Sequence, residues 1–149
     1  DEEARALLRD GMLARNDMAP LGAFQSLVRQ LLDSGHPLLR INAGAAAFWA
    51  TVADSPVLVA HARRLQAQLT NDLAQLMADA AGRPVDDAEA RLGAGMLMAS
   101  MVAAYEKGLA SQRHGEDPRE AMLQLIVRGA TGVLVALAGT PYTDPALRP

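Results

Sequence analysis

Two segments in the second half of the chain, residues 88–106 and 118–139, have the length of helices but very little polar surface. Within residues 92–105 the only polar side chains are those of Ser100 and Tyr105. The second segment has one narrow polar line, made by Gln124, Arg128 and Thr131. A helix that is apolar nearly all round has to be buried nearly all round. Any fold of this chain must therefore hide two helices from water.

The chain's own core can cover one face of each segment, and the other face needs a second cover. A two-fold homodimer, in which these helices pack against their copies, is the simplest closed solution. The expected interface residues are Met96, Leu97, Met101, Ile126, Gly129, Val133 and Leu134. Four glycines would allow close approach of the helices there: Gly93, Gly95, Gly129 and Gly132.

Two other arrangements stay open for these segments. They could be the central helices of a monomer. They could also span a membrane, but the uncharged run of the first is shorter than the ~20 residues that a span needs. Arg128 lies in the middle of the second, where a bilayer would cost roughly 2.5–3.5 kcal/mol. The homodimer is the favoured interpretation.

The rest of the chain also predicts helices. Half of its 149 residues are hydrophobic, with alanine in excess and only 3% aromatic residues, a balance that suits close helix packing. Pro20, Ser55-Pro56, the pair Asp86/Glu89 and the group Asp117-Pro118/Glu120 are helix-start signals. The six expected helices cover about residues 2–16, 20–33, 38–53, 56–81, 87–110 and 117–139. The predicted fold class is an all-α bundle of about six helices, with a loose tail over residues 141–149.

Charge and cysteine content exclude several classes of function. The formal net charge is -3 and no basic patch is visible, so the chain is not expected to bind DNA by itself. It has no cysteine, which excludes disulfides, thiolate metal sites and thiol catalysis. No secretory signal pattern is present, and a cytoplasmic location is expected. The chain opens at Asp1 without an initiator Met, which is typical of a missing N-terminal portion.

No constellation of residues points to an enzyme. His36, His61 and His114 are isolated, without a second ligand at metal-site spacing. There is no nucleophile elbow, P-loop or dinucleotide motif. The pair Asp86-Asp87 is better explained by helix capping than by acid–base chemistry. We expect no catalytic residue, no metal and no cofactor.

A small-molecule cavity has better support. Four of the five aromatic rings lie on expected helices, and seven Met residues add flexible apolar surface. Apolar walls with a few polar groups are typical of ligand pockets. The candidate ligand-binding residues are Phe24, Asn42, Phe48, Trp49, Gln68, Met98, Met101 and Tyr105. The alternative, that each is an ordinary core or surface residue, stays open.

Three stretches resemble the C-terminal region of the TetR family of bacterial transcriptional regulators. They are Phe48–Leu58, at the junction of a medium and a long helix, then Asp86–Leu92 with the small, Met-rich helix after it, and the last apolar helix from Asp117 to about Gly139. None is a strict motif, and no pocket residue can be carried over from the family.

The resemblance implies an all-helical sensor with an internal effector cavity and a homodimer through the last two helices. Residues 1–16 would connect it to a DNA-binding helix-turn-helix head, and residues 17–140 would be the sensing and dimerisation domain. Effector binding and operator binding would favour different spacings of the two heads. The main alternative is a helical homodimer that acts as a scaffold or partner-binding module. A helical enzyme with scattered catalytic groups is a third.

Overall fold

The computed structural model, which describes residues 1–149, contains six α-helices, one short 3₁₀ helix and no strand. The helices are α1 (Glu2–Leu13), α2 (Pro20–Asp33), α3 (Ala43–Ala53), α4 (Pro56–Ala80), α5 (Ala88–Arg113), α6 (Pro118–Ala136) and η1 (Pro145–Leu147). The predicted all-α fold of about six helices is confirmed.

Side-chain caps begin most of these helices. The Ser55 hydroxyl accepts a hydrogen bond of 3.4 Å from the amide of Leu58, and Pro56 takes the first helical position, as predicted. At α5 the prediction was wrong by one residue, because Asp87, and not Asp86, is the cap. Its Oδ2 accepts from the amide of Ala90 at 3.1 Å.

The start of α3 is a larger correction. The sequence predicts a helix from just after Pro37, whereas α3 begins at Ala43. The Asn42 side chain accepts a hydrogen bond of 2.9 Å from the amide of Ala45 and so caps the helix. The residue before it, Ile41, is buried against Gly108 of α5. A Cβ added to Gly108 would lie only 2.4 Å from Cδ1 of Ile41. That contact holds the chain before Asn42 outside the helix.

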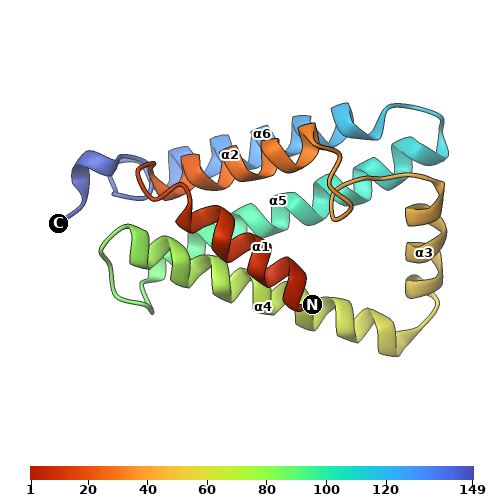
Figure 1. The fold of residues 1–149 in the computed structure, drawn as a ribbon, viewed down its shortest axis with the longest axis horizontal. Helices are drawn as coiled ribbons and strands as arrows, with labels where there is room; N and C mark the ends of the chain where they lie inside the picture. Colours follow the sequence, from red (N-terminus) through yellow and green to blue (C-terminus); the bar gives the residue numbers. More distant parts are fainter.

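The long helices α5 and α6 form an antiparallel hairpin with the most extensive contact in the fold. In Figure 1, α2 runs beside α6, α1 crosses toward α4, and α3 stands across one end of the molecule. The largest fully buried side chains come mainly from α4, α6 and the segment after α6: Leu73, Met77, Met122, Val133, Leu137 and Tyr142. The core therefore lies where α4, α5 and α6 meet.

No single helix combines the length and hydropathy that crossing a bilayer requires. The pair α3 and α4 passes that test only jointly, and the two are bent by 110° at the break between them.

The C-terminal segment differs from the loose tail that its prolines predict. Tyr142 is fully buried, and its hydroxyl donates a hydrogen bond of 2.7 Å to Oδ2 of Asp87. Its carbonyl accepts from the amide of Leu21 at 3.1 Å. Proline prevents a helix from continuing, but it does not prevent an extended segment from packing.

Arg148 fixes the end of this segment. Its Nη1 donates to the carbonyl of Asn16 at 3.0 Å, and its Nη2 donates to that of Met18 at 2.6 Å. Both carbonyls lie in the turn between α1 and α2. The C-terminal segment thus ties that turn to the N-terminus of α5.

Candidate functional site

A pair of aromatic residues links α3 to α5. The indole Nε1 of Trp49 donates a hydrogen bond of 3.0 Å to the hydroxyl of Tyr105, and the two rings meet edge to face with centroids 5.7 Å apart. Phe48 packs edge-on against Trp49 at 5.5 Å, but its own side chain is 59% exposed. The sequence placed all three in one cavity, and the structure brings Trp49 and Tyr105 into direct contact.

Two methionines extend this cluster along α5. Met101 lies one turn and Met98 two turns before Tyr105, at the spacing that shares a helix face. All three are half-buried and pack against the main core, to which Phe24 of α2 belongs. We call Trp49, Tyr105, Met98 and Met101 the aromatic–methionine cluster.

Two polar candidates do not join this cluster. Asn42 is exposed, and its side chain is engaged in capping α3, which leaves its amide oxygen bonded to the backbone. Gln68 is an exposed residue of α4 without a hydrogen-bond partner in the protein. Helical spacing alone could not show that the Asn42 side chain caps α3, or that the Gln68 side chain of α4 faces the solvent.

The α3 helix itself is unusual for a surface helix. None of its eleven residues is charged, yet Val52 is the only one that is buried. It contacts α4 and α5 but neither α1 nor α2. Because so few of its residues are buried, little packing would be lost if α3 moved.

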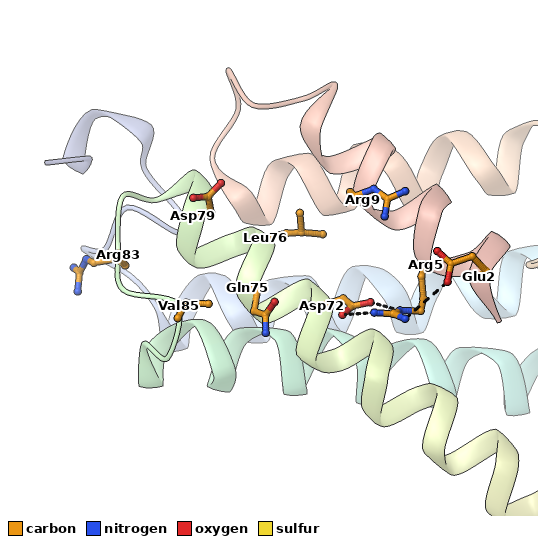
Figure 2. Close-up of a pocket in the computed structure, with 9 residues that line it drawn as sticks. All are labelled: Glu2, Arg5, Arg9, Asp72, Gln75, Leu76, Asp79, Arg83 and Val85. Atoms are coloured by element: carbon orange, nitrogen blue, oxygen red, sulfur yellow. Dashed lines mark hydrogen bonds and ion pairs between the residues drawn. The ribbon is translucent and has the colours of Figure 1, made fainter.

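Two surface recesses lie away from the aromatic–methionine cluster. One, of about 410 Å³, lies between α1 and α4 (Figure 2). The other, of about 250 Å³, lies where the end of α1, the start of α2 and Arg148 meet. None of the eight predicted ligand-binding residues lines either recess. Neither recess was predicted from the sequence, because each is lined by residues from separate helices and loops that meet only in the fold.

A second candidate surface lies on the α5–α6 hairpin. Four large apolar side chains are open there: Leu92 (51% exposed), Val127 (44%), Leu134 (50%) and Val135 (74%). We call these residues, with the half-buried Met96 and Leu123, the α5–α6 face. A lone chain leaves this apolar face in contact with water.

The predicted interface residues divide between this face and the core. Leu134 and Met96 lie on the face, whereas Leu97, Ile126 and Val133 are buried within the chain, and Met101 belongs to the aromatic–methionine cluster. Three exposed residues of the face were not among the predicted interface residues: Leu92, Val127 and Val135. When both sides of a helix are apolar, periodicity cannot tell the inner side from the outer one.

The glycines expected at the interface divide in the same way. A Cβ added to Gly129 would lie 1.9 Å from the Ser100 hydroxyl, so this glycine serves the contact between α5 and α6 of one chain. Gly93 is likewise enclosed, 2.8 Å from Leu137 Cδ1 by the same measure. Gly95 has nothing within 4 Å and leaves open space beside the α5–α6 face.

Asp87 and Tyr142 form a hydrogen-bonded pair in which both pKa values are shifted. The hydrogen bond from Tyr142 is the main cause that lowers the pKa of Asp87 below its usual 3.8. Burial, and then the bond to Asp87, raises the pKa of Tyr142 above its usual 10.0. Because Asp87 caps α5 and Tyr142 anchors the C-terminal segment, this pair serves the fold and is remote from the aromatic–methionine cluster.

No cluster of three or more side chains suited to metal binding is present. Comparison with known proteins finds no match to a family model, to a curated protein or to a solved structure. What the chain does has to be inferred from its own residues.

Proposed function

We propose that this chain is the effector-binding and dimerisation part of a transcriptional regulator of the TetR type. The observation that carries the proposal is the α5–α6 face. Monomeric proteins rarely leave large contiguous apolar patches open, and such patches usually mark interfaces. The order of six helices, ending in a long antiparallel hairpin, agrees with the resemblance of the sequence to that family.

A second copy of the chain is the partner that suits this face. Two hairpins packed through Leu92, Val127 and Leu134 would form a four-helix bundle, with each copy supplying the same surface. Exposed charged residues adjoin the apolar side chains in the sequence: Arg91 precedes Leu92, and Arg128 follows Val127. An apolar centre with a polar rim is the usual anatomy of an interface.

The effector in this proposal is a small, largely apolar molecule that binds between α3 and α5. The walls would be the aromatic–methionine cluster, since methionine adapts to varied ligand shapes and the hydroxyl of Tyr105 offers one polar contact. The uncharged α3 is joined to α5 by one side-chain hydrogen bond, that of Trp49. A ligand could replace this contact and move the helix.

DNA binding in this proposal belongs to a helix-turn-helix head joined to α1, and not to these residues. Effector and DNA would favour different positions of α1, and each would weaken the binding of the other by the same factor. The coding region upstream of Asp1 tests this part directly: a helix-turn-helix pattern there supports it, and a different domain contradicts it.

The mass of the chain in solution tests the observation that carries the proposal. Light scattering at micromolar concentration is expected to give twice the chain mass of 15.7 kDa. A stable monomer would contradict the proposal. The effector site is tested by the fluorescence of Trp49, the only tryptophan, during titration with 1-decanol and naphthalene. A saturable change that disappears in Met101→Glu supports the site, and no change with either compound contradicts an apolar effector.

A further inference from the structure

The recess of about 410 Å³ between α1 and α4, which we call the α1–α4 cleft, has a regular pattern of charge. One wall is Glu2, Arg5 and Arg9 of α1, and the other includes Asp72 and Asp79 of α4 (Figure 2). On each helix these residues are three to seven positions apart, so they share the face that lines the cleft. The volume falls within the range of roughly 300–1,000 Å³ that is usual for small-molecule sites.

One pair of opposite charges already closes across the cleft. The Arg5 Nε and Nη2 donate to the two carboxylate oxygens of Asp72 at 2.6 and 3.2 Å, as Figure 2 shows. This bidentate pair raises the pKa of Arg5 and fixes α1 against α4. It leaves the Asp72 oxygens occupied.

The next pair along the cleft stays open. At this crossing α1 and α4 run in the same direction. Arg5 of α1 pairs with Asp72 of α4, and further along both helices Met12 and Asp79 line the same neighbouring recess. Arg9 lies one turn after Arg5 and contacts only the carboxylate of its neighbour Asp10, at 3.5 Å.

The carboxylate of Asp79 has no partner at all in the protein, although it faces the same cleft. In the view of Figure 2, the side chain of Leu76 lies between Asp79 and Arg9. The open pair therefore consists of a guanidinium held only by its 3.5 Å ion pair with the neighbouring Asp10 and a carboxylate without a partner, separated by the apolar surface of Leu76.

We infer that the α1–α4 cleft binds a small zwitterion of the α-amino-acid class, whose carboxylate lies on Arg9 and whose ammonium group lies on Asp79. The guanidinium fork matches a carboxylate in a bidentate manner. The three arginines and three carboxylates of the lining cancel, so a ligand with one charge of each sign meets no net repulsion.

The remaining lining suits the rest of such a molecule. Leu76 and Val85 give apolar surface for an aliphatic side chain, and the Gln75 amide offers a hydrogen bond. A bound zwitterion would add a second bridge between α1 and α4 beside the Arg5–Asp72 pair. It would act separately from the apolar effector, because no residue of the aromatic–methionine cluster lines this cleft.

Titration of the complete chain with L-leucine, followed by backbone amide NMR, tests the inference. We expect saturable shifts confined to α1 and α4, with a Kd on the order of 1 mM or tighter. N-acetyl-L-leucine lacks the ammonium group and L-leucine amide lacks the carboxylate, and each is expected to bind at least about tenfold more weakly, a loss of about 1.4 kcal/mol. Equal binding of all three compounds, or no saturable shift with L-leucine, would overturn the inference.

Three variants locate the binding. Arg9→Gln and Asp79→Asn are each expected to weaken L-leucine binding at least about tenfold. Both side chains are exposed and make no hydrogen bond within the protein, so these variants keep the fold. Arg29→Gln, an exposed arginine of α2 outside the cleft, is the matched control and should bind normally. Binding that survives both cleft variants would place it elsewhere and overturn the inference, whatever the mass of the protein in solution.

Discussion

The hydroxyl of Tyr142 lies 2.7 Å from Oδ2 of Asp87, the same oxygen that caps the N-terminus of α5. One carboxylate oxygen thus accepts from a helix amide and from a buried phenol 55 residues away. The end of the chain and the start of its longest helix are therefore joined at a single atom.

Tyr142→Phe is expected to lower the free energy of unfolding by about 1.5–3 kcal/mol, since a buried hydrogen bond to a charged group is lost while the ring stays. Urea unfolding at neutral pH measures this change. Thr143→Val is the control, because its half-buried hydroxyl bonds only to neighbouring carbonyls. If Thr143→Val lowers the free energy of unfolding as much or more, the Tyr142–Asp87 hydrogen bond does not stabilise the fold more than an ordinary one.

The same pair predicts a pH dependence. The pKa of Asp87 is lowered in the folded protein, so its contribution to stability is present above the usual value of 3.8 and is lost as the pH falls through the folded pKa. The raised pKa of Tyr142 gives stability that is present below 10.0 and is lost as the pH rises beyond it. Tyr142→Phe should flatten both limbs of the stability curve. Unchanged limbs in the variant would contradict the assignment.

Leu134→Glu is expected to convert the proposed dimer to a monomer, because it places a charge on the apolar α5–α6 face. Light scattering across a dilution series measures the loss. Leu58→Glu is the matched control: Leu58 is exposed to a similar extent, 41% against 50%, but lies at the start of α4. A dimer that tolerates Leu134→Glu, or fails equally in both variants, would speak against this face.

Gly129→Ala is expected to destabilise the fold by about 1–3 kcal/mol, since the new methyl would overlap the Ser100 side chain. Gly22→Ala in α2 is the control. Its added Cβ meets only Met18 Cε at 3.5 Å, an ordinary contact, so the better helix propensity of Ala should leave stability equal or higher. Thermal unfolding compares the two variants, and an undiminished melting temperature in Gly129→Ala would refute the close contact.

Tyr105→Phe is expected to loosen α3, because it removes the only side-chain hydrogen bond between α3 and α5. The cost should be about 0.5–1.5 kcal/mol and local to α3. Amide hydrogen exchange of residues 43–53 should speed up while that of α6 does not change, and the emission of Trp49 should shift. Unchanged exchange in α3 would show that its packing alone holds it.

The helices and most of their first residues could be predicted from the sequence, because capping side chains and first-turn prolines act over only three or four residues. Ser55 and Asp117 are examples. It placed the start of α3 too early, since the contact of Ile41 with Gly108 joins residues far apart in the chain. It missed the anchored C-terminal segment for the same reason, as nothing near Tyr142 in sequence indicates its bond to Asp87.

The candidate sites were predicted less completely. Helical facing puts Met98, Met101 and Tyr105 on one side of α5, because one helix fixes their relative positions. It could not assign Ile126 and Val133 to the inside of α6, since both sides of that helix are apolar. The α1–α4 cleft could not be foreseen, because the pairing of Arg5 with Asp72 depends on how two separate helices cross.

The first helix is held at two points along its length, and the turn that follows it is held at a third. Arg5 ties it to α4, Gly11 receives the side chain of Leu27 from α2, and the turn that follows is gripped by Arg148. A helix held by these contacts cannot slide or tilt without moving the elements that it contacts. A movement of α4 that displaces α1 therefore also displaces α2 and the last residues of the chain. The position of α1 thus depends on the conformation of the whole subunit.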